Sequence, residues 1–189
     1  HSSKLEDMAT STTGEAHLEV DITFYGGATY ASAGSVTWTG GSTPSNGTLI
    51  MNKSSAKTLA IPENQKFFNM TVSGNGALTV TNTPYVYGLL ASSGANIVRA
   101  GNFGISGTTT PTVSGTTFAA INTMVYQAGS GNTTTITPTT YNIMRGSNST
   151  PLLMGGATTA TQIYLDGGSV SLSTRGHNLT TKTVNNAGT

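Results

Sequence analysis

The chain has 189 residues, of which 8% are charged and 35% are hydrophobic, and its formal net charge is +1. A hydrophobic fraction of this size predicts a folded chain rather than a disordered one, and no apolar run approaches the about 20 residues of a membrane-spanning helix. A near-neutral chain without clustered Lys and Arg is not expected to bind nucleic acid, and the lack of cysteine excludes disulfides and thiolate metal sites.

The first strong element in chain order is a strand at residues 17–25, "HLEVDITFY". Its apolar side chains alternate with polar ones without a break, which is the period of a half-buried strand. The apolar face consists of Leu18, Val20, Ile22 and Phe24. Two glycines, Gly26 and Gly27, then end the strand.

Five of the seven acidic residues also lie in the first 21 positions. We therefore treat residues 1–27 as an attachment or oligomerisation segment, whose apolar face is a candidate assembly strand that pairs with a neighbouring subunit. The alternative is that the strand completes the core of its own domain.

Residues 28–189 are expected to form a single β-domain. Short runs of β-branched and aromatic residues are separated by Gly, Asn and Pro at intervals of roughly 8 to 12 residues, and no stretch keeps a convincing helical period. The chain is therefore predicted to be all-β.

Two segments of this domain, residues 47–80 and 122–154, align with each other at a period of roughly 75 residues. The threonine-rich stretch "NTTTITPTTYNIM" at residues 132–144 falls in the second copy and keeps its apolar positions in register with the first. It is thus predicted to form a strand and a turn rather than a glycosylated stalk or a spacer.

Two phrases, "FFNMTVSGNG" at residues 67–76 and "LDGGSVSLSTRGHNLT" at residues 165–180, carry a resemblance to known proteins. They resemble the Thr/Gly/Asn-rich repeats of large secreted bacterial surface proteins of the adhesin-like kind and of phage fibre proteins, where such phrases recur through parallel β-solenoids. The match does not include the N-terminal strand, and Arg145 departs from it by replacing an apolar residue. The resemblance implies a parallel β-solenoid, or β-helix, in a structural or adhesive role.

The physics of a solenoid fits this pattern independently. A single coil cannot bury its inward apolar positions, so stacked coils share one core while outward positions carry Thr, Ser and Asn. We favour the parallel β-solenoid, although short strands at this spacing are also typical of a β-sandwich or jelly roll.

The sequence contains few residues and motifs that could carry out catalysis. Two-carboxylate hydrolysis of a polysaccharide needs a pair of acidic residues, yet Asp166 is the only one after residue 66. The histidines His1, His17 and His177 are isolated, and no nucleophile, phosphate-binding or metal-binding motif occurs. We expect a non-enzymatic protein without catalytic residues, cofactor or metal.

Three functions remain open at this point. The first is a structural or adhesive β-module of an extracellular filament, surface adhesin or virion fibre, whose partners are copies of itself and surface glycans. The second is a glycan-binding module, and the third is a carbohydrate-active enzyme that takes its carboxylates from a neighbouring chain. The candidate glycan-binding aromatics are Tyr25, Tyr30, Trp38, Tyr85 and Tyr87.

An ice-binding face is disfavoured. Thr133, Thr135 and Thr137 share one strand face, but the aligned positions of the first copy are Lys57, Leu59 and Ile61.

A surface of Thr, Ser and Asn with few charges favours an extracellular, cell-surface or virion location.

Overall fold

The computed structural model describes residues 16–18, 29–32, 36–38, 48–93, 97–107, 112–114, 118–128, 132–148, 150–167 and 169–187. Over these residues the chain is all-β and forms a parallel β-solenoid of about six turns. No helix in this part is long and apolar enough to cross a membrane.

The described strands belong to three sheets, the largest of which has eleven strands. Its members are β1 (Ala16–Leu18), β3 (Val36–Trp38), β5 (Lys57–Ala60), β6 (Gln65–Phe67), β8 (Leu78–Val80), β9 (Pro84–Val86), β11 (Ile97–Ile105), β13 (Phe118–Tyr126), β15 (Thr140–Gly146), β17 (Thr158–Leu165) and β19 (Leu179–Asn186). The five-stranded sheet contains β2 (Thr29–Ser32), β4 (Thr48–Lys53), β7 (Asn69–Gly74), β10 (Leu90–Ser93) and β12 (Thr112–Ser114). The third sheet contains β14 (Thr134–Ile136), β16 (Pro151–Met154) and β18 (Ser171–Ser173).

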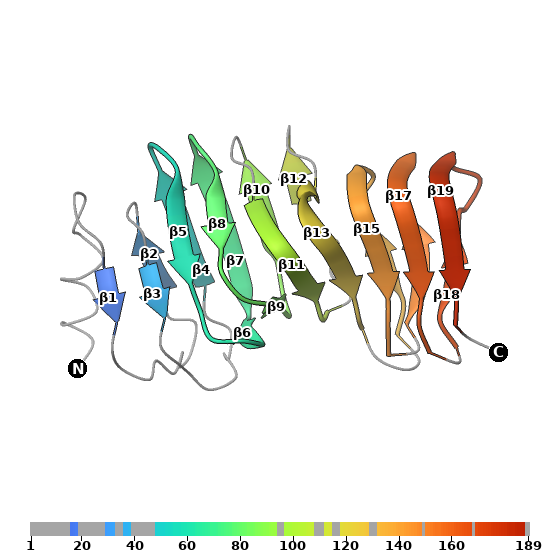
Figure 1. Ribbon diagram of the computed structural model, residues 1–189, viewed down its shortest axis with the longest axis horizontal. Coiled ribbons are helices and arrows are strands. Elements are labelled where there is room, and N and C mark those ends of the chain that lie inside the picture. The colour runs from blue at the N-terminus through green and yellow to red at the C-terminus, as the bar shows by residue number, and fades with distance from the viewer. Residues whose placement is uncertain are drawn as a thin grey trace.

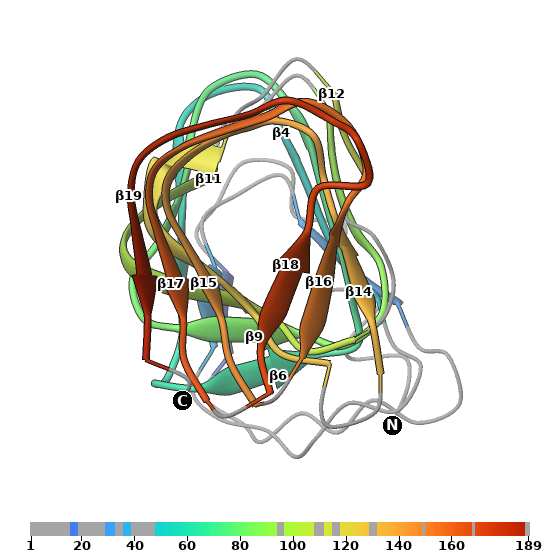
Figure 2. The ribbon, with the colours of Figure 1, turned by 90° about the vertical axis from the view of Figure 1, so that its right-hand side faces the viewer.

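Successive coils stack side by side along the long axis of the molecule (Figure 1) and follow nearly the same path around it (Figure 2). Met124 pairs with Phe103, Met144 with Met124 and Ile163 with Met144, at offsets of 21, 20 and 19 residues. Every pairing between described strands is parallel, which confirms the solenoid and excludes the antiparallel β-sandwich and jelly roll.

The repeat that builds the coil is therefore shorter than the 75-residue period found in the sequence. The strands that the sequence alignment matches lie in different sheets: β4 belongs to the five-stranded sheet, whereas β13 belongs to the eleven-stranded one. The two units are similar in sequence but do not occupy equivalent places on the coil. The single domain at residues 28–189 with two related units stays a prediction.

The interior is lined by columns of apolar side chains, each supplied by successive coils. One column consists of Phe103, Met124, Met144 and Ile163, all fully buried. Each such side chain is enclosed by its neighbours above and below, so the core is continuous along the axis.

The threonine-rich stretch contributes to this core. Thr134 and Ile136 of β14 are fully buried, Thr135 is half-buried, and the chain changes direction in a bend at residues 138–139 before β15. The predicted strand and turn are confirmed.

Three aromatic side chains, Phe118, Tyr126 and Tyr141, cluster inside the C-terminal half of the solenoid. The rings of Phe118 and Tyr141 lie 5.6 Å apart, and those of Tyr126 and Tyr141 meet edge to face at 6.4 Å. The Tyr141 hydroxyl donates to the Thr137 carbonyl oxygen at 2.7 Å, which leaves its oxygen to accept from the Tyr126 hydroxyl at 2.8 Å. Burial raises the pKa of both phenols.

A buried lysine, Lys53, connects two successive coils at a corner of the solenoid. Lys53, at the end of β4, has only 1% of its surface exposed, and its ammonium donates to the Gly76 carbonyl oxygen at 2.6 Å. Gly74 and Gly76 both have positive φ, and their backbone lies directly against the preceding coil. Burial lowers the pKa of Lys53.

The N-terminal strand is described in part. Ala16–Leu18 pairs in parallel with Val36–Trp38 of the same chain, with Leu18 beside Trp38. Val20, Ile22 and Phe24 lie outside the described residues. The assembly role of this apolar face therefore stays a prediction.

Candidate functional site

The outer surface of the eleven-stranded sheet carries a line of side chains in register across seven strands, which we call the outer row. Its members, from β6 to β19, are Lys66, Tyr85, Gly104, Val125, Arg145, Tyr164 and Asn185. They alternate along each strand with buried side chains such as Met124, Met144 and Ile163, so strand pleating directs the row outward. Adjacent members are about 4.8 Å apart along the axis.

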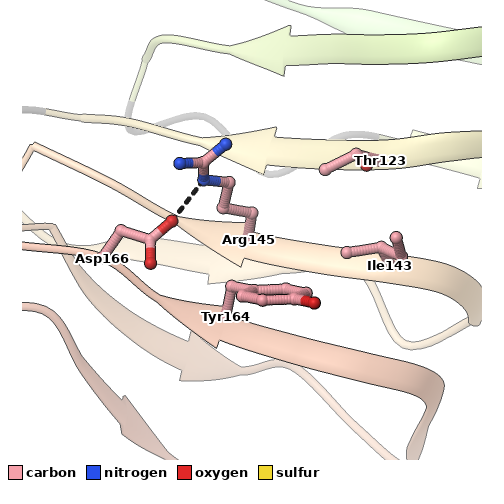
Figure 3. A pocket seen from close by; sticks show the side chains of 5 residues that line it. All are labelled: Thr123, Ile143, Arg145, Tyr164 and Asp166. Carbon is pink, nitrogen blue, oxygen red and sulfur yellow. Dashed lines mark hydrogen bonds and ion pairs between the residues drawn. The ribbon is translucent and has the colours of Figure 1, made fainter. Parts of the chain in front are cut away.

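The C-terminal part of the outer row borders a shallow depression of about 390 Å³, the Tyr164 depression, shown in Figure 3. It is lined by Thr123, Ile143, Arg145, Tyr164 and Asp166. These side chains come from β13, β15 and β17 and from the residue that follows β17. Three consecutive coils thus build one open site.

Arg145 and Asp166 form an ion pair at one end of this depression. Arg145 Nε donates to Asp166 Oδ2, and this is the only interaction of the guanidinium with the described residues. The side chains are 44% and 26% exposed, so an isolated pair here adds little to stability. Its polar atoms remain accessible from the solvent side.

Tyr164 forms a wall of the depression. Its ring is seen almost edge-on in Figure 3, with one face turned towards Arg145 and Ile143. Its hydroxyl donates to Gln162 Oε1 of the same strand at 3.2 Å, which fixes the ring along the sheet. The half-buried Ile143 and the buried Thr123 make up the rest of the lining.

The other end of the outer row is also aromatic and basic. The ring of Tyr85 occupies the space over Gly104, where any larger side chain would collide with it. Lys66 Nζ lies 5.7 Å from the centre of the Tyr87 ring. Both tyrosines are half-buried, so this end also has aromatic surface on the outer face.

Polar ladders cover the neighbouring part of the same face. Asn142 Nδ2 donates to Asn122 Oδ1 of the previous coil at 3.0 Å. Beside this pair, Thr140, Thr159 and Thr180 form a column of exposed threonines. The next outward positions include Asn142 and Lys182, so these coils do not form a regular two-column threonine array.

The two described carboxylates lie far apart. Glu63 precedes β6 and Asp166 follows β17, five strands along the sheet, which corresponds to roughly 24 Å. Two-carboxylate glycoside hydrolysis requires about 5 to 10 Å. Hydrogen bonds from Thr83, with a smaller contribution from the charge of Arg99, lower the pKa of Glu63, so neither its position nor its acidity suits a general acid.

No three potential metal ligands of the His, Asp or Glu type gather anywhere in the described ranges.

Of the candidate glycan-binding aromatics, Tyr85 and Tyr87 belong to the outer face, whereas Tyr25 and the side chains of Tyr30 and Trp38 lie outside the described part. Along the row, Tyr85 is four strands away from Tyr164 and two strands away from β13, which supplies Thr123 to the depression.

Sequence reasoning missed Tyr164 and did not assign a role to Arg145. Two signals were present in the sequence. Tyr164 alternates with Ile163 and Leu165, which predicts an outward side chain, and Arg145 interrupts an apolar strand. The proximity of Arg145 to Asp166, 21 residues later, depends on the coil length and could not be read from either segment alone.

Comparison of the chain with protein-family models, curated protein sequences and solved structures finds no match.

Proposed function

We propose that this chain is a non-enzymatic structural or adhesive β-module of an extracellular filament, surface adhesin or virion fibre, and that it associates with copies of itself through the last described coil of its solenoid. The observation that carries the proposal is the exposed core at the last described coil, β18–β19, which lies nearest the viewer in Figure 2.

Core positions that are fully buried in earlier coils become exposed in this one. Val184 continues the column of Met124, Met144 and Ile163, yet it is 51% exposed, whereas those three side chains have 0% of their surface exposed. Leu172 and Leu179 are only partly buried. Among the described residues nothing covers this apolar surface or pairs with the outer edges of β18 and β19, a combination that favours addition of another β-coil.

A second copy of this chain is a suitable partner because little charge opposes the contact. Lys182 is the only charged residue in β19, and β18 has none. Surfaces with few charges of one sign do not repel their own copies strongly. Stacked solenoids would extend the molecule along its axis, as expected of a filament or fibre component.

The wide separation of Glu63 and Asp166 supports a non-enzymatic role. The Thr- and Asn-rich outer surface, which carries few charges, and the resemblance to solenoid repeats of secreted surface and fibre proteins support an extracellular, cell-surface or virion location.

Val184→Asp is expected to weaken self-association. A carboxylate at this position would have to be buried without a partner between two coils, which costs several kcal/mol in a dry contact. The matched control is Thr183→Asp, which adds the same charge to the adjacent, outward-facing position of β19.

Analytical ultracentrifugation at a series of protein concentrations measures the result. We expect the unaltered chain and Thr183→Asp to sediment as assemblies, and Val184→Asp to shift towards the monomer while keeping its β-sheet circular dichroism. An unaltered chain that stays strictly monomeric throughout the series would contradict the proposal.

A further inference from the structure

We propose that the Tyr164 depression binds a neutral saccharide, with Tyr164 stacking on one face of a sugar ring and the Arg145–Asp166 pair holding two adjacent hydroxyl groups. This inference goes beyond the proposed assembly, since the site lies on the side of the solenoid and includes none of the exposed core residues Leu172, Leu179 and Val184.

The ion pair leaves complementary polar atoms free. It engages Nε of Arg145 and Oδ2 of Asp166, so the two Nη groups and Oδ1 remain without a partner among the described residues. In Figure 3 the interaction drawn from Asp166 runs to Nε and to neither Nη group. A hydroxyl both donates and accepts, so one sugar hydroxyl can accept from Arg145 while its neighbour donates to Asp166.

The aromatic wall supplies the second part of sugar recognition. A pyranose ring has an apolar C–H face, and its burial against a tyrosine ring excludes water from both surfaces. The face of the Tyr164 ring that is turned towards Ile143 can make this contact. The hydrogen bond from the Tyr164 hydroxyl to Gln162 restricts rotation of the ring. An aromatic surface with a few convergent polar groups is the usual composition of a small-molecule site.

The local charge balance favours a neutral ligand over an anion. Asp166 neutralises most of the charge of Arg145, and the depression has no other charged lining residue. A sulfate or phosphate would meet the Asp166 carboxylate as well as the guanidinium. Hydroxyl pairs match both groups and require no net charge.

The site is also preorganised by the fold. Arg145 and Tyr164 are register partners on adjacent strands, and Asp166 is two residues beyond Tyr164. Side chains on neighbouring strands of a sheet are held at fixed spacing, so little order has to be gained on binding.

The test uses the full chain and four probes: tetrasaccharides of glucose, galactose, mannose and N-acetylglucosamine. Saturation-transfer NMR detects binding and titration calorimetry measures the dissociation constant. At least one probe is expected to bind the unaltered chain. Tyr164→Ala should weaken that binding about tenfold or more, whereas Tyr164→Phe, which keeps the ring face, should stay within about threefold.

Tyr87→Ala tests the competing site, because Tyr87 is a half-buried tyrosine that the sequence made a candidate glycan-binding aromatic, but it lies outside the depression. It should leave saccharide binding unchanged. If no probe binds, or if Tyr87→Ala weakens binding as much as Tyr164→Ala does, the proposal is wrong.

Asp166→Asn separates a neutral ligand from an anionic one. The variant leaves the Arg145 charge unpaired, so we expect the saccharide to bind about tenfold more weakly and inorganic sulfate to bind more tightly than to the unaltered chain. Sulfate that binds the unaltered chain in place of every saccharide would overturn the proposal.

Val184→Asp distinguishes this inference from self-association. It should bind the saccharide as the unaltered chain does, whatever its sedimentation. Loss of saccharide binding in this variant would overturn the placement of the site on the side of the solenoid.

Discussion

Gly74→Ala is expected to destabilise the solenoid by about 3 kcal/mol or more. Gly74 has a φ of 86°, which alanine adopts only with strain. In addition, the new Cβ would overlap the carbonyl oxygen of Lys53 in the preceding coil. That oxygen cannot move away freely, because it accepts the Asn75 N–H at 2.7 Å.

The matched control is Gly176→Ala. Gly176 also has a positive φ, of 80°, but no atom lies within 4 Å of the position of an added Cβ. Only the backbone strain then remains, and we expect a loss of about 1 kcal/mol. Urea unfolding followed by circular dichroism measures both variants. Equal losses would show that contact between the coils does not determine the cost at Gly74.

The second large effect is alkaline unfolding driven by the buried pair of Tyr126 and Tyr141. Burial raises the pKa of each phenol above its value of about 10 in the unfolded chain. Above about pH 10 the unfolded chain therefore loses protons that the folded chain keeps. The stability from these protons is fully present below that pH and is lost as the pH rises towards the folded pKa values.

The free energy of unfolding should fall by about 1.4 kcal/mol per pH unit for each of the two tyrosines. Lys53 acts in the opposite direction, because its pKa is lowered in the folded state. Its contribution grows with pH only up to about 10.4, the pKa of an unfolded lysine, so the fall above that pH is due to the tyrosines.

Urea unfolding from neutral to strongly alkaline pH measures this slope, and tyrosinate absorbance reports the ionisation directly. Tyr126→Phe should reduce the slope to about half, because one buried phenol then remains, with its hydrogen bond to Thr137. If all tyrosines ionise together near their ordinary pKa while the chain stays folded, the phenols are not buried as described.

The strands of the solenoid were predicted from the sequence, but the length of each coil was not. Short runs of alternating residues between Gly, Asn and Pro predict β-strands, and the stretch at residues 132–144 forms the strand and turn expected of it. The coil length was not predicted, because the strongest sequence similarity spans roughly 75 residues whereas pairing between successive coils recurs after 18 to 23 residues. Different side chains fill equivalent places in successive coils, which hides the short period.

The sequence by itself determined that this protein is β-rich, nearly uncharged and poor in acidic pairs, because these properties depend on composition and on alternation along single strands. Only the tertiary structure decided which side chains meet. Arg145, Tyr164 and Asp166 come together because β15 and β17 are adjacent in one register, and a shift of a single residue in that register would turn Tyr164 towards the core. That register is set by packing over several coils, which no local pattern contains.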